Sequence, residues 1–305
     1  MSQLQPKRIV LHCGLHKTGS TYIQRNLKRN QHLLLKQGVL YLGPNTFKKR
    51  CPKLWRHLEW GRLDRRTSSA LQAETRTSLL ELAGDKPESI HTIFLSFEAI
   101  FGTLRSGLTD EGRNKMPNKE HKPGLYRYAK VRTKRLMIGL EDSLGRRPIA
   151  WTVLFANRNP EAFIRSCHTQ LIKEGHHTPE TSHFDTFRQT ADFSHSDPQQ
   201  LEQSLSKLRS KRDLTVVTLN YDQASNPQEP SIFLWNLLKR ALPNQADLLK
   251  QQLEASTESD KLSKTPNRGL SERGLELAVQ ARPLFRRSEW KLFRKFLEKN
   301  FSKSS

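Results

Sequence analysis

The sequence is poor in cysteine and in long apolar runs. It holds three cysteines among 305 residues, and this odd number, without metal-ligand spacing, argues against a disulfide framework and against a metal site. No stretch approaches the ~20 consecutive apolar residues that a membrane-spanning helix needs, and the first ten residues contain no apolar leader core. We therefore expect free thiols, no transmembrane segment and a cytoplasmic location.

Acidic residues are also scarce. Aspartate and glutamate total 30 against 52 lysines and arginines, which gives a formal net charge of +22. Such a field attracts polyanions, among them nucleic acid, anionic lipid headgroups, acidic glycans and multiply charged nucleotides. A well-solvated basic surface with no specific partner is the alternative. Nothing in the sequence indicates an oligomeric state.

The sequence contains several short apolar runs. They cover residues 8–13, 91–96, 149–157 and 214–219, with a fifth candidate at 38–43. The runs are continuous, as expected of strands buried on both faces of a parallel sheet, and helical patterns lie between them. The first such pattern, with Ile23, Leu27 and Leu34, ends at the stop signal Gly38. The alternation predicts a single three-layer α/β domain over 1–305, with ligands beyond the carboxyl ends of the strands.

Two other segments differ from this pattern. Residues 101–128 are rich in glycine, proline and charge, and we interpret them as a long lid or acceptor loop. Residues 271–305 predict a basic C-terminal helical segment, with an N-cap at Ser288 and an apolar stripe formed by Trp290, Phe293 and Leu297. That stripe favours a packed terminal helix with a basic outer face, with a membrane-surface helix as the alternative.

The most informative stretch is "GLHKTGSTYIQ", which follows the first predicted strand. Gly14 and Gly19 have the spacing of a phosphate-binding loop, in which free backbone N–H groups and a helix dipole hold an anion. In a nucleotide-triphosphatase loop the residue after the second glycine is lysine, but here it is Ser20. The only lysine, Lys17, lies inside the turn. The pattern predicts an anion site of another kind, and a simple chain reversal is the alternative.

A second motif, "RNPEAFIRS", follows the 149–157 run. Asn159 suits a helix N-cap, Pro160 suits the first helical position, and Glu161 suits the positive end of the dipole. Arg158 would then lie at the tip of a buried strand, where a guanidinium binds phosphate well, with the hydroxyl of Ser166 near the same edge. Alternatively, Arg158 pairs with a local carboxylate and Ser166 has no special role.

Taken together, these motifs resemble the sulfotransferases that use 3′-phosphoadenylyl sulfate (PAPS). "GLHKTGSTYIQ" is similar to the 5′-phosphosulfate loop of that family and "RNPEAFIRS" to its 3′-phosphate element. "FLSFEAIF" is similar to the strand that follows in many soluble bacterial members, and "LNYDQASNPQEPSIFLWNLL" is similar to their later strand, acidic turn and helix. The glycine-containing phosphate loop near the C-terminus of the family has only a loose counterpart in "NRGLS". The lysine–threonine–histidine context that carries the base of animal members is missing.

The resemblance implies the roles of the residues. The turn, through Lys17, Thr18, Gly19, Ser20 and Thr21, would bind the 5′-phosphosulfate, and Lys17 would neutralise the bridging oxygen. Arg158 and Ser166 would bind the 3′-phosphate, with Arg268 as a further contact. The implied reaction needs no metal, because a sulfuryl donor has no β,γ-diphosphate to neutralise.

The acceptor hydroxyl must lose a proton, so a base is also expected. Our first candidate is Glu98 in "FEAI", which would need partial burial to act at neutral pH; capping a helix or pairing with a lysine is the alternative. His16 is the second candidate, and a supporting hydrogen bond in the turn is its other reading. The acceptor is expected to be a hydroxyl compound, such as an acidic glycan, with no specific nucleic acid. A P-loop kinase and a non-catalytic polyanion-binding protein are the other two function classes.

Overall fold

The structure is a computed structural model that describes residues 4–16, 18–61, 65–110, 122–226, 229, 231–254 and 269–302. The chain divides into two compact units. Unit 1 comprises the described residues within Met1–Gly102, Tyr128–Asn157 and Asp197–Lys264, and unit 2 those within Thr103–Arg127, Arg158–Ser196 and Thr265–Ser305. Each unit is treated by itself below. Whether the two behave as the predicted single domain stays a prediction.

Unit 1 is built on a five-stranded, all-parallel sheet of order β2-β3-β1-β4-β5. The strands are β1 (Arg8–His12), β2 (Val39–Leu42), β3 (Thr92–Ser96), β4 (Ala150–Asn157) and β5 (Leu214–Asn220). All five predicted strands are confirmed, and the α/β fold class with them. β1 lies at the centre, between β3 and β4. From β1 the chain continues to one side of the sheet, and from β4 to the other, so the carboxyl ends of β1 and β4 mark the topological switch point.

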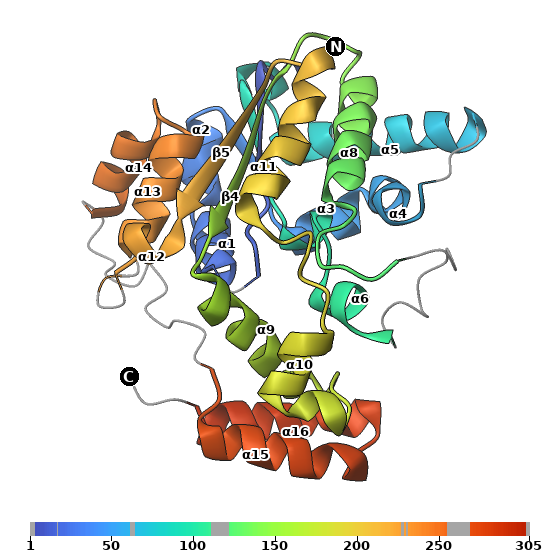
Figure 1. Cartoon of the computed structure of the whole chain (residues 1–305). Helices are drawn as coiled ribbons and strands as arrows, with labels where there is room; N and C mark the ends of the chain where they lie inside the picture. Colours follow the sequence, from blue (N-terminus) through green and yellow to red (C-terminus); the bar gives the residue numbers. More distant parts are fainter. Residues whose placement is uncertain are drawn as a thin grey trace. The chain divides into compact units, whose positions relative to one another are not determined.

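Helices cover both faces of this sheet (Figure 1). On one face, α1 (Ser20–Arg29), α2 (Gln31–Lys36), α13 (Ser231–Ala241) and α14 (Ala246–Glu254) pack their apolar sides on the strands. Ile23 and Leu27 of α1, for example, share one core cluster with Val10 of the central strand, and all three are at most 3% exposed. The short helix α12 (Tyr221–Ala224) directly follows β5. The burial of Ile23 and Leu27 against the central strand holds the start of α1 close to the end of β1.

The opposite face is covered by the long helix α8 (Ala129–Ser143) and its neighbours α3 (Pro44–Arg50), α4 (Pro52–Trp60), α5 (Arg65–Ala83) and α11 (Pro198–Ser206). Trp151 of β4 donates a hydrogen bond from its indole N–H to Glu141 of α8 at 3.0 Å. Phe101 packs edge-on against Phe155 of the same strand, with ring centroids 5.9 Å apart. Among the described residues, no helix is both long enough and apolar enough to span a membrane.

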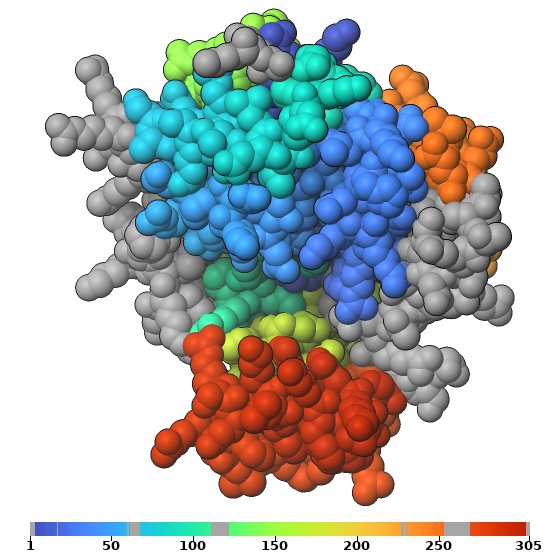
Figure 2. Space-filling model, turned by 180° about the vertical axis from the view of Figure 1, so that it is seen from behind, coloured from blue at the N-terminus to red at the C-terminus, as the bar shows by residue number. Residues whose placement is uncertain are grey.

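Unit 2 is helical. It contains α6 (Leu104–Leu108), α9 (Pro160–Glu174), α10 (Phe184–Thr190), α15 (Glu272–Ala281) and α16 (Arg287–Asn300). The C-terminal half of α9 packs on α15 and α16, whose compact surface is drawn in red in Figure 2. The indole N–H of Trp290 donates to the carbonyl of Lys173 at 3.2 Å, and the ammonium of Lys173 pairs with Glu298 at 2.9 Å.

The sequence predicted helices in the right places, but some of their first and last residues were wrong. The expected helix after the first turn divides at Asn30, whose side-chain amide donates to the carbonyl of Asn26. The predicted N-cap at Ser288 is wrong, because α16 begins at Arg287. Its N-cap is Arg286, and the carboxylate of Glu289 accepts from the Arg286 backbone N–H at 2.7 Å. The predicted lid contains α6, while residues 111–121 within it lie outside the described residues.

Candidate functional site

The turn after β1 is the first component of the candidate site. It leaves the central strand at His12 and enters α1 at Ser20, so it begins at the switch point of the sheet. The N–H of Cys13 still donates to the carbonyl of Leu154 in β4. Farther on, the buried hydroxyl of Thr18 donates to the carbonyl of Leu15 at 2.7 Å and closes the turn internally. Lys17 lies outside the described residues, so its predicted role stays a prediction.

Both glycines of the motif meet a physical requirement. A Cβ atom on Gly14 would lie 1.9 Å from the hydroxyl oxygen of Ser20 and 2.9 Å from its Cβ, so any side chain there would force Ser20 to move. Gly19 has a φ of 74°, in the left-handed region that side chains disfavour. The backbone therefore passes close to Ser20, turns sharply at Gly19 and enters the helix.

The N-terminus of α1 is open. Its N-cap residue is Gly19, so no side chain caps it, and its first turn carries no acidic residue. The first intrahelical hydrogen bonds are donated by Tyr22 and Ile23 to the carbonyl of Gly19. The N–H groups of Ser20 and Thr21 come before these donors, in the first turn, where a helix supplies no acceptor of its own. These N–H groups lie at the positive end of the helix dipole, an arrangement that binds anions.

Two buried polar atoms lie beside this helix start. The hydroxyl of Ser20, which is 3% exposed, has no hydrogen-bond partner among the described residues, and neither does Nε2 of His12, which is 1% exposed. The other ring nitrogen of His12, Nδ1, lies 2.8 Å from the hydroxyl of Ser96 at the end of β3. Burial lowers the pKa of His12 to about 4, so the imidazole is neutral near neutral pH.

The candidate bases belong to the same unit as the turn. The N–H of Phe97 donates to the carbonyl of His12 at 2.9 Å, which joins the end of β3 to the end of β1. Glu98 follows at once, half-buried, as the first residue of the short 3₁₀ helix η2 (Glu98–Ile100). His16 lies in the turn itself and is also half-buried. The partial burial expected of Glu98 is therefore present, although its place at a helix start also fits the capping alternative.

The start of α9, in unit 2, brings together two predicted residues. Nη1 of Arg158 donates to the hydroxyl of Ser166 at 3.1 Å. The predicted N-cap is confirmed, because the side chain of Asn159 accepts from the N–H of Ala162 at 3.1 Å. Arg158 itself comes directly after Asn157, the last residue of β4.

Arg268 was the remaining predicted contact, and it lies outside the described residues. Two residues later, Leu270 is fully buried, belongs to the core of unit 2 and forms an antiparallel bridge with Ser302. Leu270 thus attaches the end of the "NRGLS" stretch to the core of unit 2.

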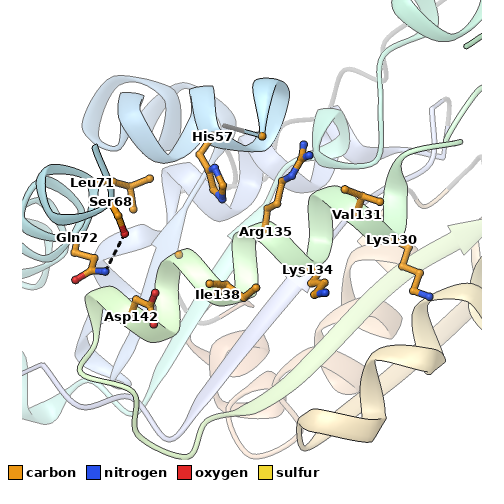
Figure 3. Close-up of a pocket in the computed structure, with 12 residues that line it drawn as sticks. His57, Ser68, Leu71, Gln72, Lys130, Val131, Lys134, Arg135, Ile138 and Asp142 are labelled. Atoms are coloured by element: carbon orange, nitrogen blue, oxygen red, sulfur yellow. Dashed lines mark hydrogen bonds between the residues drawn. The ribbon is translucent and has the colours of Figure 1, made fainter. Parts of the chain in front are cut away.

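One cavity of unit 1 is lined by other residues than these. It measures about 550 Å³ and is lined by residues of α4, α5 and α8, among them His57, Leu71, Arg135 and Ile138 (Figure 3). It holds none of the predicted site residues. Among the described residues, no group of three or more His, Cys, Asp or Glu side chains has the arrangement of a metal site. Cys13, Cys51 and Cys167 are buried, and none of them forms a disulfide among the described residues, which agrees with the predicted thiols.

Sequence reasoning missed His12 and Ser96, although a signal existed. Each occupies the last position of its strand, and the parallel register of β1 and β3 pairs them directly. Polar residues that end adjacent buried strands meet at the edge where such sheets bind ligands. No family model and no curated protein matches this chain, so the family assignment remains a proposal.

Proposed function

We propose that this chain is a sulfotransferase that moves the sulfuryl group of PAPS to a hydroxyl acceptor, with an acidic carbohydrate as the acceptor class. One observation carries the proposal. The central strand ends in a glycine turn with an open helix N-terminus and a buried Ser20 hydroxyl that has no partner among the described residues. A buried, unpaired hydroxyl destabilises a protein by about 1–3 kcal/mol unless a ligand satisfies it. An anion at this turn would do so.

The residue at position 20 favours a phosphosulfate over a nucleoside triphosphate. A triphosphatase loop needs a lysine there to reach the β- and γ-phosphates. Here the position holds a serine whose hydroxyl lies against the backbone of Gly14. A single phosphate with a sulfuryl group suits a turn that offers amides, a hydroxyl and, by resemblance, the ammonium of Lys17.

Arg158 would recognise the second phosphate of the donor. Its guanidinium is tied to Ser166 by one N–H, which restricts its rotation, while the group has five N–H donors in total. A planar donor group held in this way suits a phosphate, and the 3′-phosphate is the feature that distinguishes PAPS from ATP.

The chemistry would consist mainly of positioning and charge stabilisation. The acceptor oxygen attacks sulfur, the bond from sulfur to the bridging oxygen breaks, and the nucleotide leaves as adenosine 3′,5′-bisphosphate. Lys17 would stabilise the charge that develops on the bridging oxygen. Glu98 would take the proton of the acceptor hydroxyl, with His16 as the second candidate. The net charge of +22 would attract an acidic acceptor.

The test uses PAPS labelled in its sulfuryl group, offered with a panel of acidic polysaccharides in the presence of a metal chelator. We expect transfer by the unchanged protein, and a rate roughly 100-fold lower for Lys17→Ala and for Arg158→Ala. Lys28→Ala and Arg165→Ala are matched controls, because both residues are exposed on α1 and α9, the helices that follow the two tested positions in the sequence, and they should leave the rate unchanged.

Three outcomes would contradict the proposal. Equal transfer by Lys17→Ala would remove the role of that lysine. Phosphoryl transfer from ATP that requires Mg²⁺ would indicate a kinase. Binding of polyanions with a steep salt dependence, but without any transfer, would indicate a non-catalytic polyanion-binding protein.

A further inference from the structure

The end of the central strand carries a histidine outside the glycine motif. His12 is the last residue of β1, and its Nδ1 lies 2.8 Å from the hydroxyl of Ser96, its register partner at the end of β3. The buried phenol of Tyr41 in β2 donates to the carbonyl of Gln24 at 3.4 Å. The contact between β1 and β3 orients the imidazole, and Nε2 is the ring nitrogen without a partner among the described residues.

Nε2 of His12 and the hydroxyl of Ser20 lie close to a common point. A Cβ atom on Gly14 would be 3.2 Å from Nε2 and 1.9 Å from the hydroxyl oxygen. Neither atom has a partner among the described residues, although both side chains are more than nine-tenths buried. Buried polar side chains are nearly always hydrogen-bonded in folded proteins, so two unpaired ones at one place need an explanation. A ligand that accepts hydrogen bonds from both would provide it.

We propose that His12 is a ligand-binding residue of the turn, whose neutral imidazole donates its Nε2–H to the anion bound at the N-terminus of α1. This inference rests on the proposed function, and it adds the phosphate group of the donor's 5′ end as the acceptor of that hydrogen bond. His12 and Ser20 would then bind the anion from the strand side of the turn, and the backbone N–H groups of α1 from the helix side.

The Ser96 contact determines which tautomer can perform this role. When the Ser96 hydroxyl donates to Nδ1, the single ring proton of the neutral imidazole lies on Nε2, as an anion requires. Burial holds the pKa of His12 at about 4, so the ring contributes a hydrogen bond and no charge. The sequence places His12 in a strand and gives no hint of this tautomer, because Ser96 is 84 residues away.

Two amide variants separate ligand binding from a structural role. Glutamine at position 12 places an amide near the position of Nε2 but loses the position of Nδ1, whereas asparagine does the reverse. Adenosine 3′,5′-bisphosphate is titrated into each protein by calorimetry. We expect His12→Asn to weaken binding about tenfold, and His12→Gln to stay within about threefold of the unchanged protein. A purely structural role predicts the opposite order. His91→Gln, at the amino end of β3, is the matched control and should bind normally.

A second measurement does not depend on any variant folding. In the unchanged protein with ¹⁵N-labelled histidine, the bisphosphate should shift the His12 Nε2 resonance and leave its proton on Nε2. Failure of the unchanged protein to bind the bisphosphate would contradict the proposed function itself. Binding with equal affinity in both amide variants, or a ring proton on Nδ1 in the complex, would overturn the role of His12 and leave the proposed function standing.

Discussion

The helices α1 and α9 begin in the same way along the chain but differ in how their N-termini are satisfied. Each follows the carboxyl end of one of two adjacent parallel strands. At α9, Asn159 caps the helix, Pro160 removes an N–H and Glu161 complements the dipole. At α1 a glycine occupies the cap, no acid stands in the first turn, and Ser20 is buried without a partner among the described residues.

This difference indicates what each helix start can bind. The N-terminus of α9 is already capped by Asn159, so a ligand there would be bound by the side chains of Arg158 and Ser166 and not by the helix backbone. The start of α1 has no side-chain cap and a buried hydroxyl without a partner among the described residues, so a ligand there would be bound by the backbone and by buried side chains. Four predictions test this contrast, in order of decreasing effect.

Gly14→Ala should have the largest effect, because the added Cβ would overlap the Ser20 hydroxyl oxygen at 1.9 Å. We expect a loss of bisphosphate binding of at least ~100-fold and a destabilisation of up to about 3 kcal/mol, as for other overpacked sites. Calorimetry and urea denaturation measure the two effects. Gly84→Ala is the control for binding, since a Cβ there would have no neighbour within 4 Å among the described residues. Normal binding by Gly14→Ala would mean that the turn is not a tight anion site.

Acid should destabilise the turn after β1. The folded-state pKa of His12 is lowered to about 4 from an ordinary value of about 6.5, so between these values the unfolded chain binds more protons. Stability should therefore fall as the pH falls through this window, with His12 contributing a loss of about 2 kcal/mol near pH 5. Above about pH 6.5 the contribution disappears.

Urea denaturation at several pH values measures this slope, and His12→Gln should reduce it. The lowered pKa of His177 in unit 2 acts in the same direction and is present in both proteins, so the comparison isolates His12. An unchanged slope in the variant would show that the imidazole is not buried in the neutral form.

Ser20→Ala should separate stability from binding. The Ser20 hydroxyl has no partner among the described residues, so its removal should increase the free energy of unfolding of the unliganded protein, by up to about 1–3 kcal/mol. Bisphosphate affinity should fall about tenfold, because the donor to the anion is lost. A stability loss without any change in affinity would contradict an anion role for this hydroxyl.

Asn159→Ala should show the reverse pattern with the smallest effect. Loss of the cap to Ala162 should cost about 1 kcal/mol of stability. Because the cap is internal to the helix, bisphosphate affinity should change less than twofold as long as Arg158 and Ser166 keep their bond. Thermal melting and calorimetry on the same sample measure both quantities. A large affinity loss would mean that this helix start also contacts the ligand.

The strands and the start of α9 were predictable because their signals are local. Continuous apolar runs identified all five strands, and Asn159 followed by Pro160 located a helix start to the residue. The strand order was not predictable, because pairing joins residues far apart in the chain. The position of the α16 start was missed for a subtler reason: serine is the better N-cap by type, but the carboxylate of Glu289 reaches the N–H of Arg286.

The candidate site was only partly predictable. The motif supplied Gly14, Gly19 and Ser20, since glycine spacing directly reflects backbone geometry. His12 was not found, because its significance depends on burial and on Ser96 in another strand. The motif therefore predicted the backbone of the candidate anion site, while the buried side chains His12 and Ser96 could be identified only from the structure.

The helix α9 has consequences beyond its first turn. Its early residue Ser166 fixes Arg158, and its late residue Lys173 is held by Trp290 and Glu298 of α16. Shortening the protein before Arg287 would remove both partners of Lys173 and leave a nearly buried ammonium without its counter-ion. The C-terminal helices thus fix the far end of the helix whose first turns hold Arg158. If Arg158 binds a phosphate as proposed, deleting these helices should weaken that binding.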